Sequence, residues 1–457
     1  MPETIAAAPT SSVSLAQATR VWAKIGWLSF GGPAGQIAVM HRELVEQRRW
    51  ISESRFLHAL NYCMLLPGPE ATQLAIYIGW LMHRTRGGLV AGVLFVLPGV
   101  IVLFGLSVLY ASVGQLPMVT AIFFGLKAAV LAVVVQAVLR IARRALKGRF
   151  FVGVAIAAFL AIHVFGLPFP LIVAGAAGLG VVARWWGPHG FPEPPTAEAL
   201  AGDGYLIDQM MLRGELVHTK PSRMRTLRVA VIGPVLWATP LVVVVALWGH
   251  DSVLAREGTF FSEAAVVTFG GAYAVLAFIA QRVVTDYGWL SPAQMLDGLA
   301  LAETTPGPLI MVVQFVAFMA AFQHQTGMSP WLAGIIGSLL TVWVTFVPCF
   351  LWVFLGGPYV EALRGNRALH AALSAVTAAV VGVVLNLSVW FAEHTIFGSV
   401  RVFHAGPIHL DIPLWSTLNP AALLLAAGAL IAMLRLRVGM VWTLGVCAGL
   451  GAVFHFL

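Results

Sequence analysis

Residues 30–33 of this chain read FGGP and residues 67–69 read PGP, and the same signals return as FGG at 269–271 and PGP at 306–308. Residues 30–69 align on residues 269–308 without a gap, at a constant offset of 239, with 12 identities in 40 positions. Half of these identities are glycines, prolines and a tryptophan, which two unrelated apolar helices would not share in register. The register resumes after an eleven-residue shift, where Pro98 matches Pro348. The sequence therefore predicts an internal duplication.

The composition places this duplicated chain in a membrane. Of 457 residues, 59% are hydrophobic and only 10% are charged, and the mean hydropathy is +0.88. This excludes a soluble enzyme, and about twenty apolar residues span a bilayer core of roughly 30 Å. The net charge of +8 comes largely from basic residues in short loops, where they set orientation instead of binding nucleic acid. We expect an all-α polytopic membrane protein, and residues 1–12 lack the features of a cleaved signal peptide.

Uninterrupted apolar stretches predict membrane-spanning helices. They are residues 88–111, 117–139, 150–166, 169–184, 229–249, 331–355, 368–387, 420–434 and 438–456. Shorter helical pieces flank the first FGGP and PGP motifs, at residues 15–30, 33–49, 52–66 and 69–83. A helix of about fifteen residues reaches roughly 22 Å, which is less than the core thickness. We therefore expect broken or re-entrant helices at these motifs in both halves.

The duplication predicts two homologous repeats in inverted topology. The first repeat makes an even number of crossings, whether its broken elements both cross or both turn back. One additional span at 229–249 then inverts the second repeat, as in many secondary transporters. The predicted organisation is an N-terminal tail (1–14), a first repeat (15–185), a cytoplasmic linker (186–228), a connecting helix (229–249) and a second repeat (259–457).

The distribution of basic residues agrees with this inversion. Lys and Arg concentrate in alternate connections and are nearly absent from the connections between them, apart from Arg401. The basic connections carry Arg84, Arg86, Arg140, Arg143, Arg144, Lys147, Arg149, Arg213, Lys220, Arg223, Arg225, Arg228, Arg364, Arg367, Arg435 and Arg437. We expect these connections, including the linker, to be cytoplasmic.

The helix breaks are the first candidates for a binding site. Non-helical backbone at membrane depth is tolerated only where it is buried in protein or lines a cavity. A proline at the start of a helix leaves free N–H groups that favour an anion, and glycines allow close backbone approach. The candidate substrate-binding residues are Phe30, Gly31, Gly32, Pro33, Pro67, Gly68, Pro69, Gly270, Gly271, Pro306, Gly307, Pro308 and Lys127. The alternative is that the breaks are only tight turns packed between helices.

Ionisable residues within apolar segments form a second group of candidates. Lys127 lies near the centre of a predicted span, where a charge costs roughly 2.5–3.5 kcal/mol, so it either neutralises a bound anion or pairs with a carboxylate. Glu70 follows the first PGP and Glu303 precedes the second, and both are candidate proton carriers or, alternatively, helix caps or partners of an arginine. Arg42 and Glu43 are candidates for gating an anion entry, or belong to a charged cytoplasmic face.

The sequence predicts no cofactor and no metal site. Cys63, Cys349 and Cys447 lie in apolar segments without metal-ligand spacing, so a disulfide framework is not indicated either. Single histidines such as His58 and His163 are also without paired metal-ligand spacing.

Several of these motifs together resemble the signatures of the chromate ion transporter (CHR) family, in its long form with two homologous domains. The motifs are Phe30-Gly31-Gly32-Pro33, Arg42-Glu43-Leu44-Val45, Trp50, Pro67-Gly68-Pro69 and LAETTPGP at residues 301–308. The resemblance covers nearly the whole chain except the linker and the termini. Ala272 departs from the pattern because the first half has Pro33 at the matching position, which weakens the second FGG turn as an anion-binding end.

The resemblance implies export of chromate from the bacterial cytoplasm across the inner (plasma) membrane, with chromate resistance as the result and sulfate as a competing analogue. A dianion leaving a negative interior gains about 4.6 kcal/mol per 100 mV, and the sequence has no phosphate-binding GxxxxGK[ST] loop. A secondary transporter is therefore expected.

Two alternatives remain open at this point. One is a transporter of sulfate or another oxyanion, because chromate and sulfate share shape and charge. The other is a membrane-embedded enzyme acting on a lipid phosphate, which would need several arginines around a nucleophile, whereas only Arg42 and Glu43 are adjacent. The expected partners are chromate and the lipid bilayer, with sulfate, protons and a second copy of the chain as further candidates, and no nucleic acid.

Overall fold

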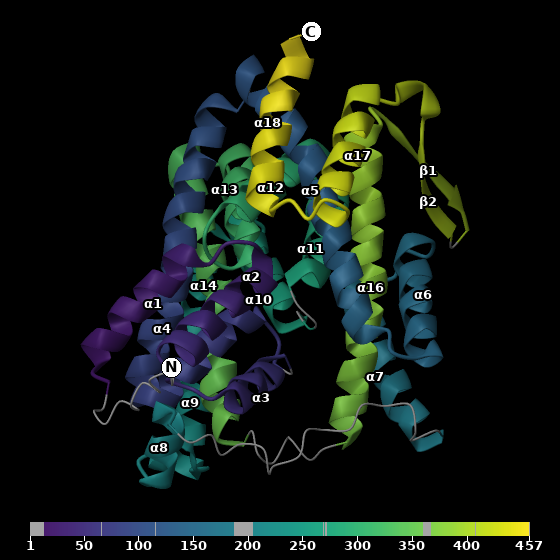
Figure 1. The fold of residues 1–457 in the computed structure, drawn as a ribbon. Helices are drawn as coiled ribbons and strands as arrows, with labels where there is room; N and C mark the ends of the chain where they lie inside the picture. Colours follow the sequence, from purple (N-terminus) through teal and green to yellow (C-terminus); the bar gives the residue numbers. More distant parts are fainter. Residues whose placement is uncertain are drawn as a thin grey trace, which may run out of the picture.

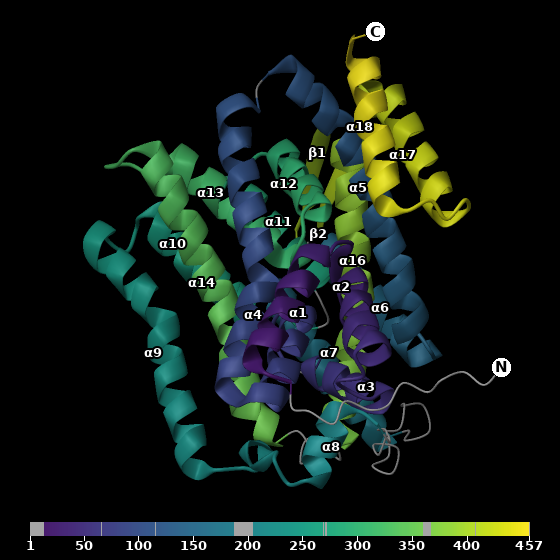
Figure 2. The same ribbon diagram turned by 60° about the vertical axis from the view of Figure 1, so that its left-hand side comes forward.

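The computed structural model describes residues 13–64, 66–114, 116–186, 204–267, 269, 272–359, 367–406 and 408–456. Helices dominate the described chain (Figures 1 and 2). Five of its helices are long and apolar enough to cross a membrane. The expected class, an all-α polytopic membrane protein, is therefore confirmed. Gly270 and Gly271, most of the N-terminal tail and residues 187–203 of the linker lie outside the described residues.

The first repeat is built of seven α-helices and one π-helical turn. They are α1 (Leu15–Leu28), α2 (Gly32–His41), the π-helix η1 (Arg42–Gln47), α3 (Glu53–Cys63), α4 (Glu70–Val113), α5 (Pro117–Ala145), α6 (Arg149–His163) and α7 (Phe169–Trp186). The segment between the repeats contains α8 (Leu206–Leu212), the 3₁₀ turn η4 (Val217–Thr219) and α9 (Arg223–Trp248).

The second repeat follows the same order of elements. It comprises α10 (Val253–Val267), α11 (Ala272–Gln281), the π-helix η5 (Arg282–Asp286), α12 (Pro292–Thr304), η6 (Leu309–Met311), α13 (Val312–His324), α14 (Pro330–Gly356), η7 (Gly357–Tyr359), α16 (Arg367–Ile396), β1 (Val400–Ala405), β2 (Ile408–Pro413), η8 (Trp415–Thr417), α17 (Pro420–Leu434) and α18 (Met440–Phe456). The antiparallel hairpin β1–β2 has no strand counterpart among the described residues of the first repeat.

The duplication reaches into local backbone geometry. Each repeat has a π-helical turn after its second helix, η1 and η5, a feature that is rare in proteins. A tryptophan follows each π-helix, and its backbone N–H donates to a carbonyl within the π-helical turn. Trp50 donates to the Leu44 carbonyl at 2.7 Å, and Trp289 donates to the Val283 carbonyl at 2.9 Å. These residues are related by the same offset of 239 that the sequence alignment uses.

Helix α4 consists of two pieces that fold back on each other. His83 and Arg84 have non-helical backbone angles, with φ +54° at Arg84. A Cβ on Gly79 would lie 2.5 Å from the carbonyl oxygen of Gly87, so only glycine permits this contact. The expected short helix at 69–83 and the expected span at 88–111 are therefore separate arms joined by a tight turn.

The last helices of each repeat pack on the long helix of the other repeat. Helices α17 and α18 cover α5, whereas α6 and α7 cover α16. At the α5–α18 crossing, a Cβ on Gly125 would lie 1.8 Å from the carbonyl oxygen of Cys447. At the α16–α6 crossing, a Cβ on Gly382 would lie 2.1 Å from the carbonyl oxygen of Ala155. The two repeats are thus interlocked through close glycine contacts and are not simply adjacent.

Four of the expected spans form helices that are shorter than the five long apolar helices, namely α6, α7, α17 and α18. Helices α6 and α17, with fifteen residues each, reach only about 22 Å. In both views the α17–α18 connection lies well above the end of the molecule that carries α8 (Figures 1 and 2). This connection contains Arg435 and Arg437, whose expected cytoplasmic position stays a prediction.

The described part of the linker is docked and does not hang free. The N–H groups of Leu206 and Ile207 donate to the carbonyls of Arg49 and Trp50 at 3.1 and 2.9 Å. Nε of Arg55 on α3 donates to the buried carboxylate of Asp208 at 2.7 Å. The polar composition of this segment predicted a linker. Its helix α8 also satisfies two backbone carbonyls of the connection between η1 and α3.

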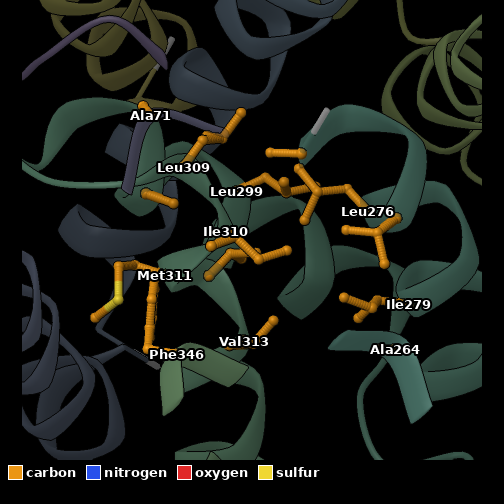
Figure 3. Packing of buried hydrophobic residues seen from close by; sticks show 14 of the residues in the cluster. Ala71, Ala264, Leu276, Ile279, Leu299, Leu309, Ile310, Met311, Val313 and Phe346 are labelled. Atoms are coloured by element: carbon orange, nitrogen blue, oxygen red, sulfur yellow. The ribbon is translucent and has the colours of Figure 1, made fainter. Parts of the chain in front are cut away.

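The buried core is continuous across both repeats. Figure 3 shows part of it, where Leu309, Ile310 and Met311 of η6 lie near Leu299 of α12 and Phe346 of α14. All five of these residues are buried. The segment that follows the second PGP motif is therefore held inside protein, as non-helical backbone in a membrane must be.

The interlocking predicts a large effect of one glycine substitution. Gly125→Leu should lower the free energy of unfolding of the detergent-solubilised protein by about 1–3 kcal/mol, because the leucine side chain must displace the backbone of α18. Gly105→Leu is the matched control, since a Cβ there meets no atom within 4 Å. Thermal unfolding followed by size-exclusion chromatography measures both. Equal stability of the two variants would contradict the close α5–α18 crossing.

Candidate functional site

The first helix break is a left-handed glycine turn. Helix α1 ends at Leu28, and Gly31 and Gly32 have φ +86° and +66°, which residues with a side chain rarely adopt. Pro33 stands in the first turn of α2, where its missing N–H costs nothing. Phe30 is 39% exposed beside this turn. The FGGP motif thus ends one helix and presents the amino end of the next.

The second PGP motif is bonded directly to this first break. The N–H of Gly307 donates to the carbonyl of Ser29 at 2.9 Å. Nε2 of the buried Gln36 on α2 donates to the carbonyl of Gly307 at 2.6 Å. Gly307 has φ +97°, and a Cβ there would lie 3.0 Å from Cα of Gly99 on α4. Breaks that are far apart in the sequence therefore meet at one buried point, which we call the break junction (Ser29, Gly32, Gln36, Gly307).

The first PGP motif has an equivalent environment in the opposite repeat. Gly68 has φ +121°, and a Cβ there would lie 3.3 Å from Sγ of Cys349 on α14. Nε2 of Gln73 donates to the carbonyl of Pro67 at 2.7 Å. Cys349 follows Pro348 as Gly99 follows Pro98. Each PGP tip therefore packs against the proline-containing helix of the other repeat.

A buried carboxylate lies beside the break junction. The hydroxyl of Tyr273 on α11 donates to Oε1 of Glu303 at 2.9 Å. A Cβ on Gly32 would lie 3.4 Å from that same hydroxyl. Glu303 is 2% exposed, and within the described chain its Oε2 has no hydrogen-bond partner. The junction therefore carries one acidic group with a free oxygen.

Two exposed arginines of α5 lie within electrostatic range of the helix breaks, and the sequence analysis counted them only as loop charges. Arg140 is close enough to Glu303 and Tyr273 to interact electrostatically with both. Arg144 interacts in the same way with Glu70, which begins α4 after the first PGP. Their i, i+4 spacing, which places both on one helix face, was the available sequence signal. The expected α5 span ended at 139, whereas the helix continues to Ala145.

Lys127 has a partner that the sequence analysis did not identify. Its Nζ lies 3.1 Å from Oδ1 of Asp297 on α12, and the hydroxyl of Tyr110 donates to Oδ2 of Asp297 at 2.8 Å. Asp297 is 6% exposed. The structure therefore favours the second of the two interpretations of Lys127, an ion pair with a carboxylate. This ion pair joins α5 of the first repeat to α12 of the second.

Arg42 and Glu43 have separate surroundings. Glu43 is 1% exposed and accepts a hydrogen bond from Nζ of Lys24 at 2.7 Å, and it is paired with Arg48 as well. Burial raises the pKa of Glu43, but the hydrogen bond from Lys24 and the charges of Arg48 and Lys24 outweigh burial and leave the pKa below its usual value. Arg42 is exposed. Glu43 therefore belongs to an ion-pair cluster, and gating by either residue stays a prediction.

The described chain offers no group of three or more His, Cys, Asp or Glu side chains that could hold a metal ion. What it does offer is a buried meeting point of glycine-rich backbone, with one carboxylate inside and Arg140 of α5 within electrostatic range of that carboxylate. Such an arrangement can bind and release a small anion, since backbone N–H groups and arginines are typical anion ligands.

Comparison with known proteins identifies the family. The family model described as "Chromate transporter" matches residues 16–181 and 258–452. The chain belongs to the chromate transporter family. A chromate transport protein of Pseudomonas aeruginosa is 31% identical over 417 residues, covering 89% of each chain. No solved structure matches the chain.

Other members of the chromate transporter family match over similar lengths. A chromate transport protein of Cupriavidus metallidurans is 28% identical over 405 residues, covering 86% of this chain and 88% of the relative. A probable chromate transport protein of Synechococcus elongatus is 28% identical over 372 residues, covering 81% and 83%. These relatives are named transport proteins, not enzymes, and this chain is likewise a multi-pass transporter and not an enzyme.

The ion pair of Lys127 predicts a specific pattern of stability. Asp297→Asn should lower the free energy of unfolding by up to about 3–5 kcal/mol, because it leaves a buried ammonium without its carboxylate. The double variant Lys127→Met with Asp297→Asn should recover most of this loss, since neither charge remains. Thermal unfolding of the two single variants and the double variant measures the coupling. Additive losses in the double variant would show that the two side chains do not stabilise one another.

Proposed function

We propose that this chain is a secondary transporter that exports chromate from the cytoplasm across the bacterial inner membrane and thereby confers chromate resistance. Relatives named as chromate transport proteins match it over most of their length and support the substrate. The observation that carries the proposal is the break junction, where the Gly307 backbone bonds to Ser29 and Gln36 of the other repeat.

The proposed binding region lies around the three described breaks, between the two PGP tips and the FGGP turn. The amino ends of α2 and α4 follow Pro33 and Pro69 and supply N–H groups for the oxygens of a dianion. Arg140 and Arg144 of α5 supply positive charge next to these ends. Glu303 is the proposed proton carrier, since an ionised carboxylate there would repel the anion.

An inverted arrangement of the repeats supports alternating access to this region. Helices α6 and α7 lie toward the end of the molecule with α8, whereas their counterparts α17 and α18 lie toward the opposite end (Figure 1). Two short helices that enter and leave the membrane on the same side, such as α6 and α7, add no net crossing. The first repeat therefore still makes an even number of membrane crossings, and α9 adds one crossing. We propose on this basis that the repeats run in opposite directions and that the linker is cytoplasmic.

The driving force for export is available without ATP. Two negative charges leaving a negative interior gain about 4.6 kcal/mol per 100 mV of membrane potential. Sulfate has the same charge and shape and is the second candidate substrate. Exchange of chromate for protons that enter the cell would add the energy of the proton gradient to that of the membrane potential. A homodimer is a further proposal, and chromate transport does not require it.

Flux measurements test substrate, direction and coupling together. Inside-out vesicles that contain the protein should accumulate radiolabelled chromate when an inside-positive potential is imposed. Sulfate in excess should reduce this uptake if the two anions share the site. Membrane potential and pH gradient are varied separately, and vesicles without the protein are the control. Failure to accumulate chromate under either gradient would overturn the proposal.

The tips predict different sensitivities to substitution. Gly68→Val should abolish chromate transport, because φ +121° excludes a β-branched residue and a Cβ there would lie 2.9 Å from Nε2 of Gln73. Leu212→Ala at the end of α8 is the control, since this side chain is 85% exposed. Transport is measured at matched protein amounts in the membrane. Equal activity of both variants would remove the first PGP tip from the site.

The arginine face predicts an effect on apparent affinity. Arg140→Gln should raise KM for chromate several-fold with a smaller change in the maximal rate, because it removes positive charge beside Glu303. Arg143→Gln is the matched control, since Arg143 is exposed on the same helix but does not interact electrostatically with Glu303 or Glu70. Initial uptake rates over a range of chromate concentrations give both parameters, and the same KM in both variants would contradict a role for this face.

A further inference from the structure

One buried acid lies outside every group described above. Glu257 on α10 is 0% exposed, and within the described chain neither carboxylate oxygen has a hydrogen-bond partner of good geometry. A carboxylate buried without a partner is costly, whereas the protonated acid is much less so. In apolar segments, ionisable groups of this kind mark proton relays and ion paths.

The surroundings of Glu257 contain no compensating charge. Ala317 and Ala321 of α13 and Gly337 of α14 surround it, and a Cβ on Gly337 would lie 2.6 Å from its Oε2. The polar group nearest to it is the backbone of Ala321. No charged residue described on α9, α11, α13 or α14, the elements that pack on α10, interacts electrostatically with it. Glu257 is therefore not one half of a structural ion pair.

A line of unpartnered hydroxyls leads away from Glu257 along α14. Ser338, Thr341 and Thr345 lie on one face of that helix at i, i+3 and i+7, and all three are buried. Their hydroxyl oxygens have no hydrogen-bond partner in the described chain. The line continues with Cys349, which packs on Gly68 of the first PGP tip. From Ser338 to Cys349 the helix rises about 16 Å.

These hydroxyls differ from several other buried or partly buried hydroxyls of the long helices, although Ser52 and Thr72 are buried without a partner as well. Serine and threonine in a helix usually donate to a carbonyl one turn back. Ser107, Thr377 and Ser388 do so at 2.7 to 2.9 Å. Ser338, Thr341 and Thr345 keep both donor and acceptor capacity free inside an apolar helix pair, which is what a chain that passes protons requires.

We propose that Glu257 is a proton-binding site, and that Thr341 and Thr345 connect it to the first PGP tip. The inference rests on the proposed function and deepens it by adding a second proton site, which supplies protons from the outer face, to the proposed carrier Glu303 at the break junction. Helix α10 begins directly after the connecting helix α9. In the proposed topology this places Glu257 near the outer face, so that protons enter from outside while the anion leaves. The proton binds to the carboxylate, passes along the hydroxyls and is released toward the cytoplasm, and Glu257 returns to its initial state.

The test uses the full-length protein in proteoliposomes that contain a pH-sensitive dye, with chromate or sulfate as the transported anion. Anion-dependent proton movement and anion flux are recorded with the potential clamped and only the pH gradient varied. Wild-type protein should move protons opposite to the anion. Glu257→Gln should lose both the proton movement and the effect of the pH gradient, while chromate exchange at equal pH continues.

Matched variants separate proton binding from folding. Glu263→Gln changes an exposed glutamate on the same helix and should behave as wild type. Thr341→Val and Thr345→Val keep the side-chain shape and should slow proton movement several-fold, which gives a result even if Glu257→Gln does not fold. Proton movement that is unchanged in these threonine variants, or in a folded Glu257→Gln, overturns the inference.

The outcomes for the two proposals are distinguishable. Chromate flux that ignores the pH gradient, with no proton movement, overturns the role of Glu257 and leaves chromate export standing. Proton movement that accompanies sulfate alone and disappears in Glu257→Gln supports the role of Glu257 and overturns chromate as the substrate. Absence of proton movement with both anions overturns the inference.

Discussion

Broken backbone inside a membrane has to find hydrogen-bond partners, and in this protein the second PGP tip finds them in the first repeat. The Gly307 N–H and carbonyl are both taken up by the first repeat, through the Ser29 carbonyl and the Gln36 amide. An unsatisfied backbone group in an apolar medium costs several kcal/mol. The second repeat therefore depends on the first to close this break, whereas Gln73 closes the Pro67 carbonyl within the first repeat. The reciprocal packing of α5 with α17 and α18, and of α16 with α6 and α7, joins the two repeats a second time.

This constraint also links folding to transport. If the repeats move relative to each other, the bonds between Gly307, Ser29 and Gln36 must break or be exchanged for others. The close contact of Gly307 with Gly99, and of Gly68 with Cys349, leaves no room for side chains at the tips.

The sequence was sufficient to predict the elements that depend on local chemistry. Glycine and proline mark the breaks because few other residues tolerate those backbone angles, and their recurrence at an offset of 239 revealed the duplication. Contacts between distant segments were not predictable in this way. Nothing near Lys127 in the sequence points to Asp297, which is 170 positions away. Docking of α8 was also hidden, because its backbone bonds to Arg49 and Trp50 do not depend on side-chain identity.

The polar groups of the two repeats are distributed unequally, although the backbones correspond. At the offset of 239, Met64 stands opposite Glu303, Ala34 opposite Tyr273 and Val275 opposite Gln36. The acid, its tyrosine and the amide that holds Gly307 therefore each occur once. Duplicated backbone gives two tips that can move in a symmetric way, whereas a single set of polar groups defines one path for charge. A symmetric pair of sites would bind two anions close together at a cost in repulsion, and the substitutions remove that cost by keeping the chemistry in one place.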